Sequence, residues 1–443
     1  MVKSHLVTTE FSLKDEMEGF LEKTAGSKKL FDRAQGALPS GSTRAPYYYA
    51  PYPLYIKRGE GAYVWDVDGN RYLDFANNMG PLILGHRHPV VQEAVSEQVD
   101  AFWCGGPTEH EVKLAEEIQR AYPMGEKVLF TPSGTEATMK LIRAARASTG
   151  KDRIMMSTGA YHGSHDLVTG PTGVPQSYQN LVSRYTYNDE QSFVTEFRKN
   201  KNELGAVILE AVLGHAGSTP PTRSFLKTMR EETEKAGVPL IFDEVVTGFR
   251  LARGGITERF GVKPDGVTLG KIIGGGFPVG AFLGPDRMMM SYGYSKTEFP
   301  LIGKAPIMQS GTFNAHPVTM AAGLATLGIL TPAAYDHLES VGDDARRIMD
   351  RVATEHHVPH SMTGTGSMFF MHFSETAVAN YEESASSDEK KGRLFDALML
   401  THGVSMPAFH TAFASLPMGK AELELFERAV DLSLSDMKKL GEI

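Results

Sequence analysis

The feature of this 443-residue chain that most constrains its fold is an alternation of short apolar runs with amphipathic stretches between about residues 90 and 300. The stretches between runs, such as Phe225–Lys235, repeat apolar side chains at helical spacing. Runs that are apolar throughout are typical of strands buried on both faces of a sheet. We therefore expect an α/β fold with a mainly parallel sheet covered by helices on both sides. The clearest runs are Lys127–Phe130, Arg153–Met156, Gly205–Leu209, Pro239–Phe242 and Gly266–Leu269.

The residues that follow these runs are the first candidates for chemistry. In a parallel sheet the carboxyl ends of the strands meet at one edge, and active sites gather there. Each run is followed by a polar or glycine-containing segment. These segments contain Ser133–Thr135, Tyr161–Gly163, Glu210, Asp243–Glu244 and Lys271.

Lys271 is the strongest single candidate. It comes just after the apolar run ending at Leu269, and three consecutive glycines, Gly274 to Gly276, follow it. Glycines allow a large group to approach the backbone closely. A partly desolvated lysine amine beside such a surface loses its proton readily and can attack a carbonyl to form a Schiff base. An ordinary surface lysine is the alternative for this stretch taken alone.

The loop Thr131–Ala137 follows one apolar run and opens a helical segment. Backbone amides at a helix N-terminus, beside the hydroxyls of Ser133 and Thr135 around Gly134, suit a phosphate group. A plain helix cap formed by Ser133 and Glu136 explains the same residues. The loop lacks the lysine of a nucleotide-binding Walker loop.

Asp243 directly follows the run that ends at Phe242. A carboxylate at the end of a buried strand needs a partner, and a protonated ring nitrogen would serve. Opposite charges ~4 Å apart interact by roughly 4 kcal/mol at an effective dielectric of about 20, which corresponds to about three pKa units. A structural salt bridge is the alternative.

Three further residues could contact a ligand. Tyr161 could lie flat against an aromatic ligand, Thr312 could bind a phosphate oxygen, and Arg44 could take a substrate carboxylate through two hydrogen bonds. Core packing, a helix-entry loop and an unpaired surface arginine are the respective alternatives.

The histidines do not indicate a metal site. His86 and His88 are spaced as H-x-H, and His162 and His165 as H-x-x-H. Neither pair has clustered carboxylate or cysteine ligands beside it, so we expect no metal.

The segments outside the alternating region indicate two smaller parts. Residues 12–37 predict one or two surface helices, and residues 53–75 predict a β-meander whose hairpin turn is Asp68–Asn70. After about residue 315 the pattern predicts a smaller α+β part with a small-residue helix, a charged helix, strands near residues 366–373 and a final helix from Lys420. We therefore divide the chain into residues 1–75, packing with the C-terminal part, 76–314, the large α/β domain, and 315–443, the small domain.

Composition narrows the functional class. The net charge of −8 comes with no basic block, which argues against a nucleic-acid partner. No apolar span reaches membrane length, and the first 20 residues carry no apolar signal core. Cys104 is the single cysteine, so the chain has no intramolecular disulfide, and we expect it to be a buried thiol. The composition predicts a cytoplasmic protein that binds no membrane.

Taken together, these candidates describe one site with a Schiff-base lysine, a phosphate cradle, an aspartate for a ring nitrogen and a flanking aromatic. Those are the requirements of pyridoxal 5′-phosphate. In these residues the chain resembles the class III pyridoxal-phosphate aminotransferases, in the branch of glutamate-1-semialdehyde aminomutase and the β-amino-acid (β-phenylalanine) aminotransferases. The motifs that carry the resemblance are Ser133–Ala137, Tyr161–Gly163, Asp243–Arg250, Leu269–Gly276 and Ser310–Phe313.

The resemblance implies fold type I, with a mainly parallel seven-stranded sheet between helices and a smaller α+β domain. It implies a homodimer with the active site at the interface, in which Thr312 reaches the partner's cofactor phosphate. Lys271 would form the Schiff base and move the substrate proton, and Asp243 would pair with the ring nitrogen. The remaining cofactor contacts implied by the resemblance are Ser133, Gly134, Thr135, Tyr161, His162, Glu210 and Val245.

The resemblance also bears on the substrate. Arg44 matches the arginine that this branch uses for a substrate carboxylate, and the segment Tyr47–Pro53, which includes Tyr48, resembles the β-amino-acid enzymes more than the aminomutase. His410 aligns where the aminomutase usually carries a glutamate. We therefore expect an aminotransferase that moves an amino group from an amine or (β-)amino acid to a keto acid. The alternatives are the aminomutase, which is an isomerase, and a non-catalytic module that binds a phosphate ligand.

Overall fold

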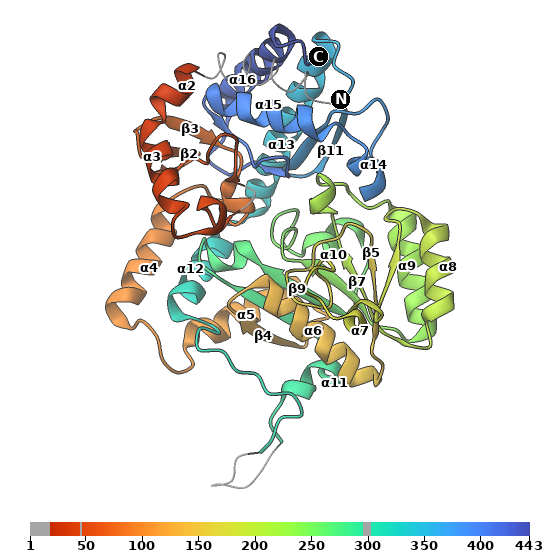
Figure 1. The fold of residues 1–443 in the computed structure, drawn as a ribbon. Helices are drawn as coiled ribbons and strands as arrows, with labels where there is room; N and C mark the ends of the chain where they lie inside the picture. The colour runs from red at the N-terminus through yellow and green to blue at the C-terminus, as the bar shows by residue number, and fades with distance from the viewer. Residues whose placement is uncertain (1–17, 45–46, 296–302) are drawn as a thin grey trace.

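The computed structural model describes residues 18–44, 47–295 and 303–443, and its centre is a seven-stranded sheet (Figure 1). The strand order is β4-β10-β9-β8-β7-β5-β6, and six of the strands run parallel to one another. The prediction of a mainly parallel α/β sheet is thus confirmed. The strands are β4 (Lys127–Thr131), β5 (Arg153–Ser157), β6 (Val182–Tyr185), β7 (Leu204–Glu210), β8 (Leu240–Glu244), β9 (Gly266–Gly270) and β10 (Gly280–Gly284).

Two of these strands are not among the five predicted runs. β10 lies between β4 and β9 and is antiparallel to both. β6 is the edge strand beside β5, and its side chains alternate between buried and less buried positions. A four- or five-residue strand with glycines at both ends, or with exposed alternate residues, carries too little apolar periodicity to stand out in the sequence.

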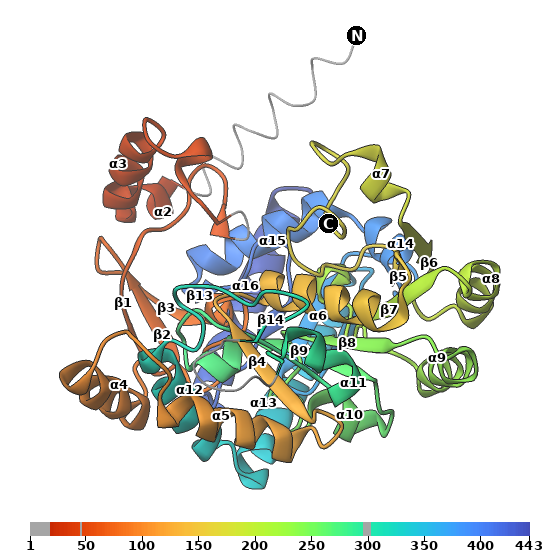
Figure 2. The ribbon, with the colours of Figure 1, turned by 90° about the horizontal axis from the view of Figure 1, so that it is seen from below.

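Helices cover both faces of this sheet, because alternate strand residues point to opposite sides. Ile208 packs with α6 (Gly134–Thr149) and α11 (Asp286–Met289), whereas Val207 and Leu209 pack into the core on the other face. Figure 2 shows α6 and α5 on opposite sides of the strands. The helices of that second face are α5 (Glu109–Ala121), α8 (Glu190–Asn200), α9 (Arg223–Ala236), α10 (Gly255–Phe260) and α12 (Pro317–Ile329).

Local sequence sets the ends of these helices. The hydroxyl oxygen of Ser133 accepts a hydrogen bond from the amide of Glu136 and begins α6, which ends at Gly150 in a left-handed conformation (φ 67°). In α9 the Thr222 side chain plays the same part for the amide of Phe225. The capping alternative for the Ser133 loop is therefore realised, and it leaves the amides of the first helical turn without intrahelical acceptors.

The N-terminal meander joins the C-terminal part of the chain through a second sheet, of order β1-β2-β3-β13. The parallel pairing of β3 with β13 brings Leu73 opposite Val404. The strands of this sheet are β1 (Ile56–Glu60), β2 (Tyr63–Asp66), β3 (Arg71–Asp74) and β13 (Val404–Ser405). Where one or two N-terminal helices were predicted, the structure has two, α2 (Glu18–Lys23) and α3 (Ala25–Ala34). The start of that predicted region, residues 12–17, lies outside the described residues.

The C-terminal part has its own core around Phe369, Phe426 and Leu434. A three-stranded sheet, β11-β12-β14, packs there against helices. Its elements are α13 (Pro332–Glu355), β11 (Ser361–Thr365), β12 (Met368–His372), α14 (Tyr381–Ala385), α15 (Glu389–Thr401), β14 (Ala412–Phe413) and α16 (Lys420–Lys439).

Helix α12 packs with the large body, against α4 (Pro89–Ala101) and α5. The division at residue 315 therefore stays a prediction about chain organisation, since α12 follows that point. No single helix of the described residues is long and apolar enough to cross a membrane; α12 and α13 meet the length and composition test only together, and they are bent by 82°.

The expectation for Cys104 was wrong. Its thiol is exposed, in the loop between α4 and α5 that also carries Trp103, which is 71% exposed. The prediction followed the general tendency of free cysteines to be buried. The placement of this loop is decided by tertiary packing that the sequence pattern does not reveal.

Candidate active site

Lys271 is the residue around which the site is built. It follows β9, is partly buried, and its Nζ donates a hydrogen bond to the carbonyl oxygen of Met79 at 2.6 Å. Its backbone has a φ of 48°, a left-handed conformation that is strained for a lysine. Removal from water, and then the positive charge of Arg250, lower the pKa of the lysine amine to about 8. A substantial fraction of such an amine is neutral near pH 8, as a nucleophile or a base requires.

Two buried carboxylates lie at the ends of the neighbouring strands β7 and β8, where Glu210 pairs in register with Asp243. Asp243 Oδ2 lies 2.8 Å from His162 Nδ1. Asp243 Oδ1 accepts hydrogen bonds from the amide of Val245 and the hydroxyl of Thr268, both at 3.1 Å. These three partners hold the Asp243 carboxyl group in one orientation at the end of β8.

Glu210 is held by backbone amides. Oε2 accepts from the Tyr161 amide at 3.0 Å and Oε1 accepts from the Gly214 amide at 2.9 Å. Burial raises the pKa of Glu210 to about 7, while the nearby His162 acts in the opposite direction. Glu210 therefore fixes the loop that presents Tyr161, whose ring is 56% exposed.

The predicted phosphate cradle adjoins these carboxylates. A Cβ atom on Gly134 would lie 2.8 Å from the side chain of Val245, so only glycine lets the start of α6 approach this closely. Thr135 Oγ1 accepts a 3.4 Å hydrogen bond from the amide of Ser164. Ser133, Gly134, Thr135 and Val245 are thus brought to one place, as the sequence predicts.

The loop after β3 forms another wall of the site, against Lys271, and was not predicted. Asn77, Asn78 and Met79 have φ values of 45°, 53° and 65°, and Gly80 continues the run at 107°. Asp74 Oδ1 accepts the amides of Ala76 and Asn77, at 3.0 and 3.1 Å. Asp74 Oδ2 lies 2.7 Å from His86 Nε2. Buried Asp74 and half-buried His86 therefore support a strained loop whose Met79 carbonyl accepts the Lys271 amine.

The predicted substrate residue Arg44 reaches the same loop. Its Nη1 donates to Asn78 Oδ1, and both residues line a cavity of about 350 Å³. Tyr47, Tyr49 and Tyr72 also line this cavity, and the Tyr49 hydroxyl is buried with no hydrogen-bond partner among the described residues. The cavity therefore combines a guanidinium at one side with aromatic walls.

Three predicted site residues do not line this cavity. The ring of Tyr48 packs on Phe31 of α3, with centroids 6.0 Å apart, and does not line the cavity. His410 lies just before β14, where the hydroxyl of the following residue, Thr411, donates to Gly214 O at 3.0 Å. Thr312 is exposed on the chain between α11 and α12, three residues after Gln309, whose side chain contacts Phe130 O at 3.1 Å and Lys140 Nζ at 2.6 Å.

The residues present fit pyridoxal 5′-phosphate by their chemistry. A partly buried amine of lowered pKa, a buried and ordered carboxylate, a helix N-terminus packed through Gly134, and an exposed tyrosine ring meet at one sheet edge. Residues that sequence reasoning missed are Asn78, Met79, Asp74 and Arg250. The segment Asn77–Gly80 does carry a signal, because asparagine and glycine favour left-handed turns.

Comparison with known proteins gives a consistent set of similarities. Residues 45–418 match the family described as Aminotransferase class-III. A glutamate-1-semialdehyde 2,1-aminomutase of Thermus thermophilus is 39% identical over 419 residues, which cover 90% of this chain and 96% of that protein. An omega-transaminase from Sphaerobacter thermophilus is 37% identical with a TM-score of 0.87, covering 93% of this chain and 98% of that one. The β-phenylalanine aminotransferase from Variovorax paradoxus is 31% identical with a TM-score of 0.88, covering 98% and 99%.

Proposed function

Because this chain belongs to the class III aminotransferase family, as an enzyme that works with pyridoxal 5′-phosphate, we propose that it moves an amino group from an amine or (β-)amino acid to a keto acid. The observation that carries the proposal is Lys271, partly buried and of lowered pKa, beside the buried strand-end carboxylate of Asp243.

The cofactor would be held by residues from four strand ends. The amides and hydroxyls of Ser133, Gly134 and Thr135 suit its phosphate, Asp243 suits its ring nitrogen, and Tyr161 and Val245 flank the ring. Glu210 and His162 support these residues through the contacts described above. When bound, pyridoxal phosphate supplies the electron sink that makes the bond between the substrate's amine-bearing carbon and its hydrogen acidic.

Lys271 performs the two tasks that the protein itself must supply. Its neutral amine would hold the cofactor through the cofactor's carbonyl carbon, and the same amine, when free, would take and return the substrate proton. The lowered pKa of Lys271 favours this exchange near neutral to mildly basic pH. Asp243 is held in one orientation at the end of β8, because its oxygens contact His162, Val245 and Thr268.

For the substrate we propose a carboxylate with an aryl or other bulky side chain, such as a β-amino acid. Arg44 would bind the carboxylate, and the cavity walled by Tyr47 and Tyr49 would receive the side chain. The likeness to the β-phenylalanine aminotransferase supports this choice. Tyr48 and His410 remain proposed substrate residues, Tyr48 at the outer side of this segment and His410 in the loop before β14.

The aminomutase reaction is the second candidate, favoured by the names of the relatives that share 35–39% identity with this chain. It moves the amino group within one molecule and needs no keto acid acceptor. The two reactions are separated by supplying racemic β-phenylalanine with pyruvate or 2-oxoglutarate and measuring alanine or glutamate. Glutamate 1-semialdehyde is supplied alone in a parallel assay.

Transamination is expected in the first assay, and Lys271→Ala is expected to abolish it together with the visible absorbance of the attached cofactor. Isomerisation of the semialdehyde without amino transfer to either keto acid would favour the aminomutase. Normal turnover by Lys271→Ala would contradict both reactions.

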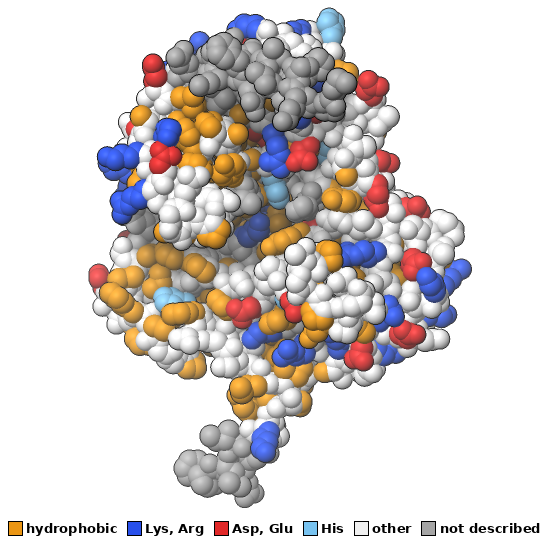
Figure 3. Space-filling view, in the orientation of Figure 1, with side chains coloured by type: hydrophobic (Ala, Val, Ile, Leu, Met, Phe, Trp, Pro, Cys, Tyr) orange, Lys and Arg blue, Asp and Glu red, His pale blue; other side chains and the backbone are white. Residues whose placement is uncertain are grey.

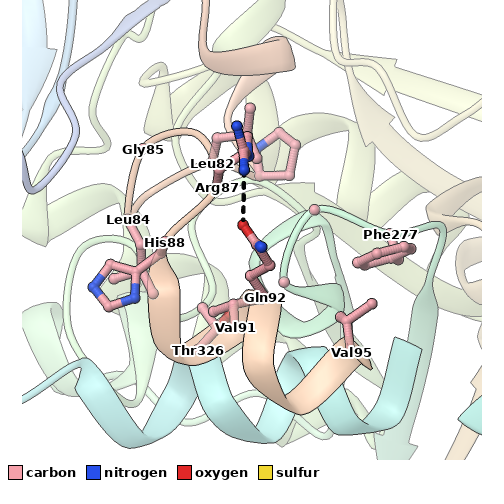
Figure 4. A pocket seen from close by; sticks show the side chains of 13 residues that line it. Leu82, Leu84, Gly85, Arg87, His88, Val91, Gln92, Val95, Phe277 and Thr326 are labelled. Atoms are coloured by element: carbon pink, nitrogen blue, oxygen red, sulfur yellow. Dashed lines mark hydrogen bonds between the residues drawn. The ribbon is translucent and has the colours of Figure 1, made fainter. Parts of the chain in front are cut away.

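We also propose a homodimer with shared active sites. Support comes from exposed apolar side chains in the segments that follow α4 and precede α12, among them Trp103, Met308 and Phe313. Figure 3 shows hydrophobic side chains gathered over α4 and α12. An open cavity of about 370 Å³ lies there, with Val91 and Val95 of α4 pointing into it beside Phe277 (Figure 4). A second copy of the chain would cover this face and bring its Thr312 to the cofactor phosphate.

A further inference from the structure

Arg250 is a buried guanidinium for which the described part of the chain supplies no acidic partner. Its side chain is fully buried, and among the described residues no carboxylate lies within salt-bridge distance of it. Its hydrogen bonds go instead to Gly80 O, to Ser367 Oγ at 3.0 Å and to Ala414 O at 3.2 Å. Burying a charge in this way is costly, and burial lowers the pKa of Arg250 to about 9. The cost of burying this charge indicates that Arg250 has a role beyond packing.

The carbonyl that Arg250 holds is next to the one that receives Lys271. Met79 O accepts the lysine amine at 2.6 Å, and Gly80 O accepts the guanidinium. These two carbonyls belong to the left-handed run that begins at Asn77. A run of three non-glycine residues in this conformation persists only when its surroundings fix it, and Arg250 supplies a charged hydrogen bond at its end.

The same guanidinium joins this loop to the C-terminal part of the chain. Ser367 lies between β11 and β12, and Ala414 directly follows β14. The guanidinium also lies 5.0 Å from the centroid of the Phe413 ring. Phe413 in turn accepts the side-chain amide of Asn77 through its carbonyl at 2.5 Å. Arg250 therefore contacts the two segments whose relative position sets where the loop lies.

The charge of Arg250 also favours the neutral form of the Lys271 amine. The charged groups that face Lys271 are Arg250, Glu210 and Asp243. After removal from water, the charge of Arg250 is the main influence that lowers the pKa of the lysine, and the two carboxylates oppose it. The fixed guanidinium thus keeps part of the Lys271 population neutral in spite of two nearby acids.

We propose that Arg250 is a positioning residue for Lys271: it fixes the Met79–Gly80 peptide against which the lysine amine lies, and it ties this peptide to the C-terminal part of the chain. The proposal rests on the proposed function for the role of Lys271. The contacts of Arg250 with Gly80, Ser367 and Ala414 do not depend on which substrate the protein binds.

The test compares Arg250→Lys and Arg250→Met, each in the full chain. Arg253→Lys and Arg253→Met are matched controls, because Arg253 binds Glu117 and the carbonyl of Leu327 rather than the carbonyls of the Asn77–Gly80 loop. Two readouts need no catalysis. The first is the pH dependence of Lys271 labelling by an amine-reactive reagent in cofactor-free protein, read by mass spectrometry, and the second is hydrogen–deuterium exchange of residues 75–80.

Arg250→Met is expected to raise the labelling midpoint of Lys271 by on the order of one pH unit, because a positive charge is lost. It is also expected to speed exchange in residues 75–80 by roughly tenfold. Arg250→Lys keeps the charge but not the forked geometry, so it should speed exchange while leaving the midpoint in place. Arg250→Lys also gives a decisive result if Arg250→Met fails to fold.

Unchanged exchange of residues 75–80 in Arg250→Lys would overturn the proposal, as would the same changes in the Arg253 variants. Either result is distinct from a failure of the proposed function, which is read from amino transfer and from Lys271→Ala.

Discussion

Replacing Asp396 by asparagine is expected to change how the stability of this protein depends on pH. Asp396 lies on α15, is 6% exposed, and its Oδ2 accepts a hydrogen bond from the amide of Phe409 at 2.6 Å. Burial raises the pKa of this carboxyl from 3.8 to about 7, although the Phe409 amide and the charge of Arg393 act in the opposite direction. Phe409 precedes His410, so the carboxyl anchors a loop of the proposed substrate site.

The sign follows from where the proton is bound. Between about pH 4 and pH 7 the folded chain holds a proton on Asp396 and the unfolded chain does not. The free energy of unfolding therefore falls as pH rises through this window, and the contribution is fully present below pH 4. A shift of about three pKa units at 1.36 kcal/mol each amounts to about 4 kcal/mol. Asparagine has nearly the same shape and does not titrate, so Asp396→Asn removes this dependence.

The assay is urea unfolding followed by tryptophan fluorescence at pH 5 and pH 8, for the wild-type chain and Asp396→Asn. Relative to wild type, the variant should gain about 1–3 kcal/mol of stability between these two pH values, since part of the window lies below pH 5. Asp32→Asn is the control, because that carboxylate is 55% exposed. An equal difference between wild type and Asp396→Asn at both pH values would refute the reasoning.

The other predictions concern the active site. Arg44→Ala should raise KM for carboxylate-bearing donors by roughly 10- to 100-fold with little change for amines that lack a carboxylate, since a charged hydrogen bond contributes about 1.5–3 kcal/mol. Steady-state kinetics with matched donors checks this prediction. An equal rise in KM for both kinds of donor would contradict it. Asp243→Asn should lower kcat by at least about 100-fold while the protein still folds, because the substitution removes the carboxyl group but keeps the shape of the side chain. Circular dichroism tests the folding and steady-state kinetics tests kcat. A normal kcat would argue against the role of Asp243. Mixed dimers of Lys271→Ala with Thr312→Ala should regain activity that neither variant has alone, because one of the two shared sites is then intact. Sedimentation and activity measurements after mixing test this. No recovery of activity in verified mixed dimers would count against shared sites.

Much of the large domain could be predicted because its strands are buried on both faces. Such strands need uninterrupted apolar residues, so the runs ending at Phe130, Met156, Leu209, Phe242 and Leu269 were visible. Their carboxyl ends then meet at one edge by geometry, so Glu210, Asp243 and Lys271 could be placed together from the chain alone. β10 was missed because its five residues are bounded by glycines, and β6 was missed because its four residues alternate between buried and less buried positions.

The part of the site made by other regions was less accessible to sequence reasoning. Arg44 could be proposed from its side-chain chemistry and from the resemblance, but the segment beside it suggested Tyr48, whereas Tyr47 and Tyr49 line the cavity. The Tyr48 ring packs on Phe31 while the rings on either side of it face the cavity, so a shift of one residue decides which rings face the site. The exposed thiol of Cys104 is a similar case, since burial of a loop residue depends on what packs over it.

The sequence by itself determined which residues end the buried strands, because burial dictates apolar runs and the chain direction dictates which end carries Lys271, Asp243 and Glu210. Only the tertiary structure decided what faces them. The carbonyls of Met79 and Gly80 carry no side-chain signature, and they reach Lys271 and Arg250 only because residues 192 and 170 positions apart in the chain pack together. Backbone groups are identical in every residue, so their role depends on a local fold fixed by distant contacts.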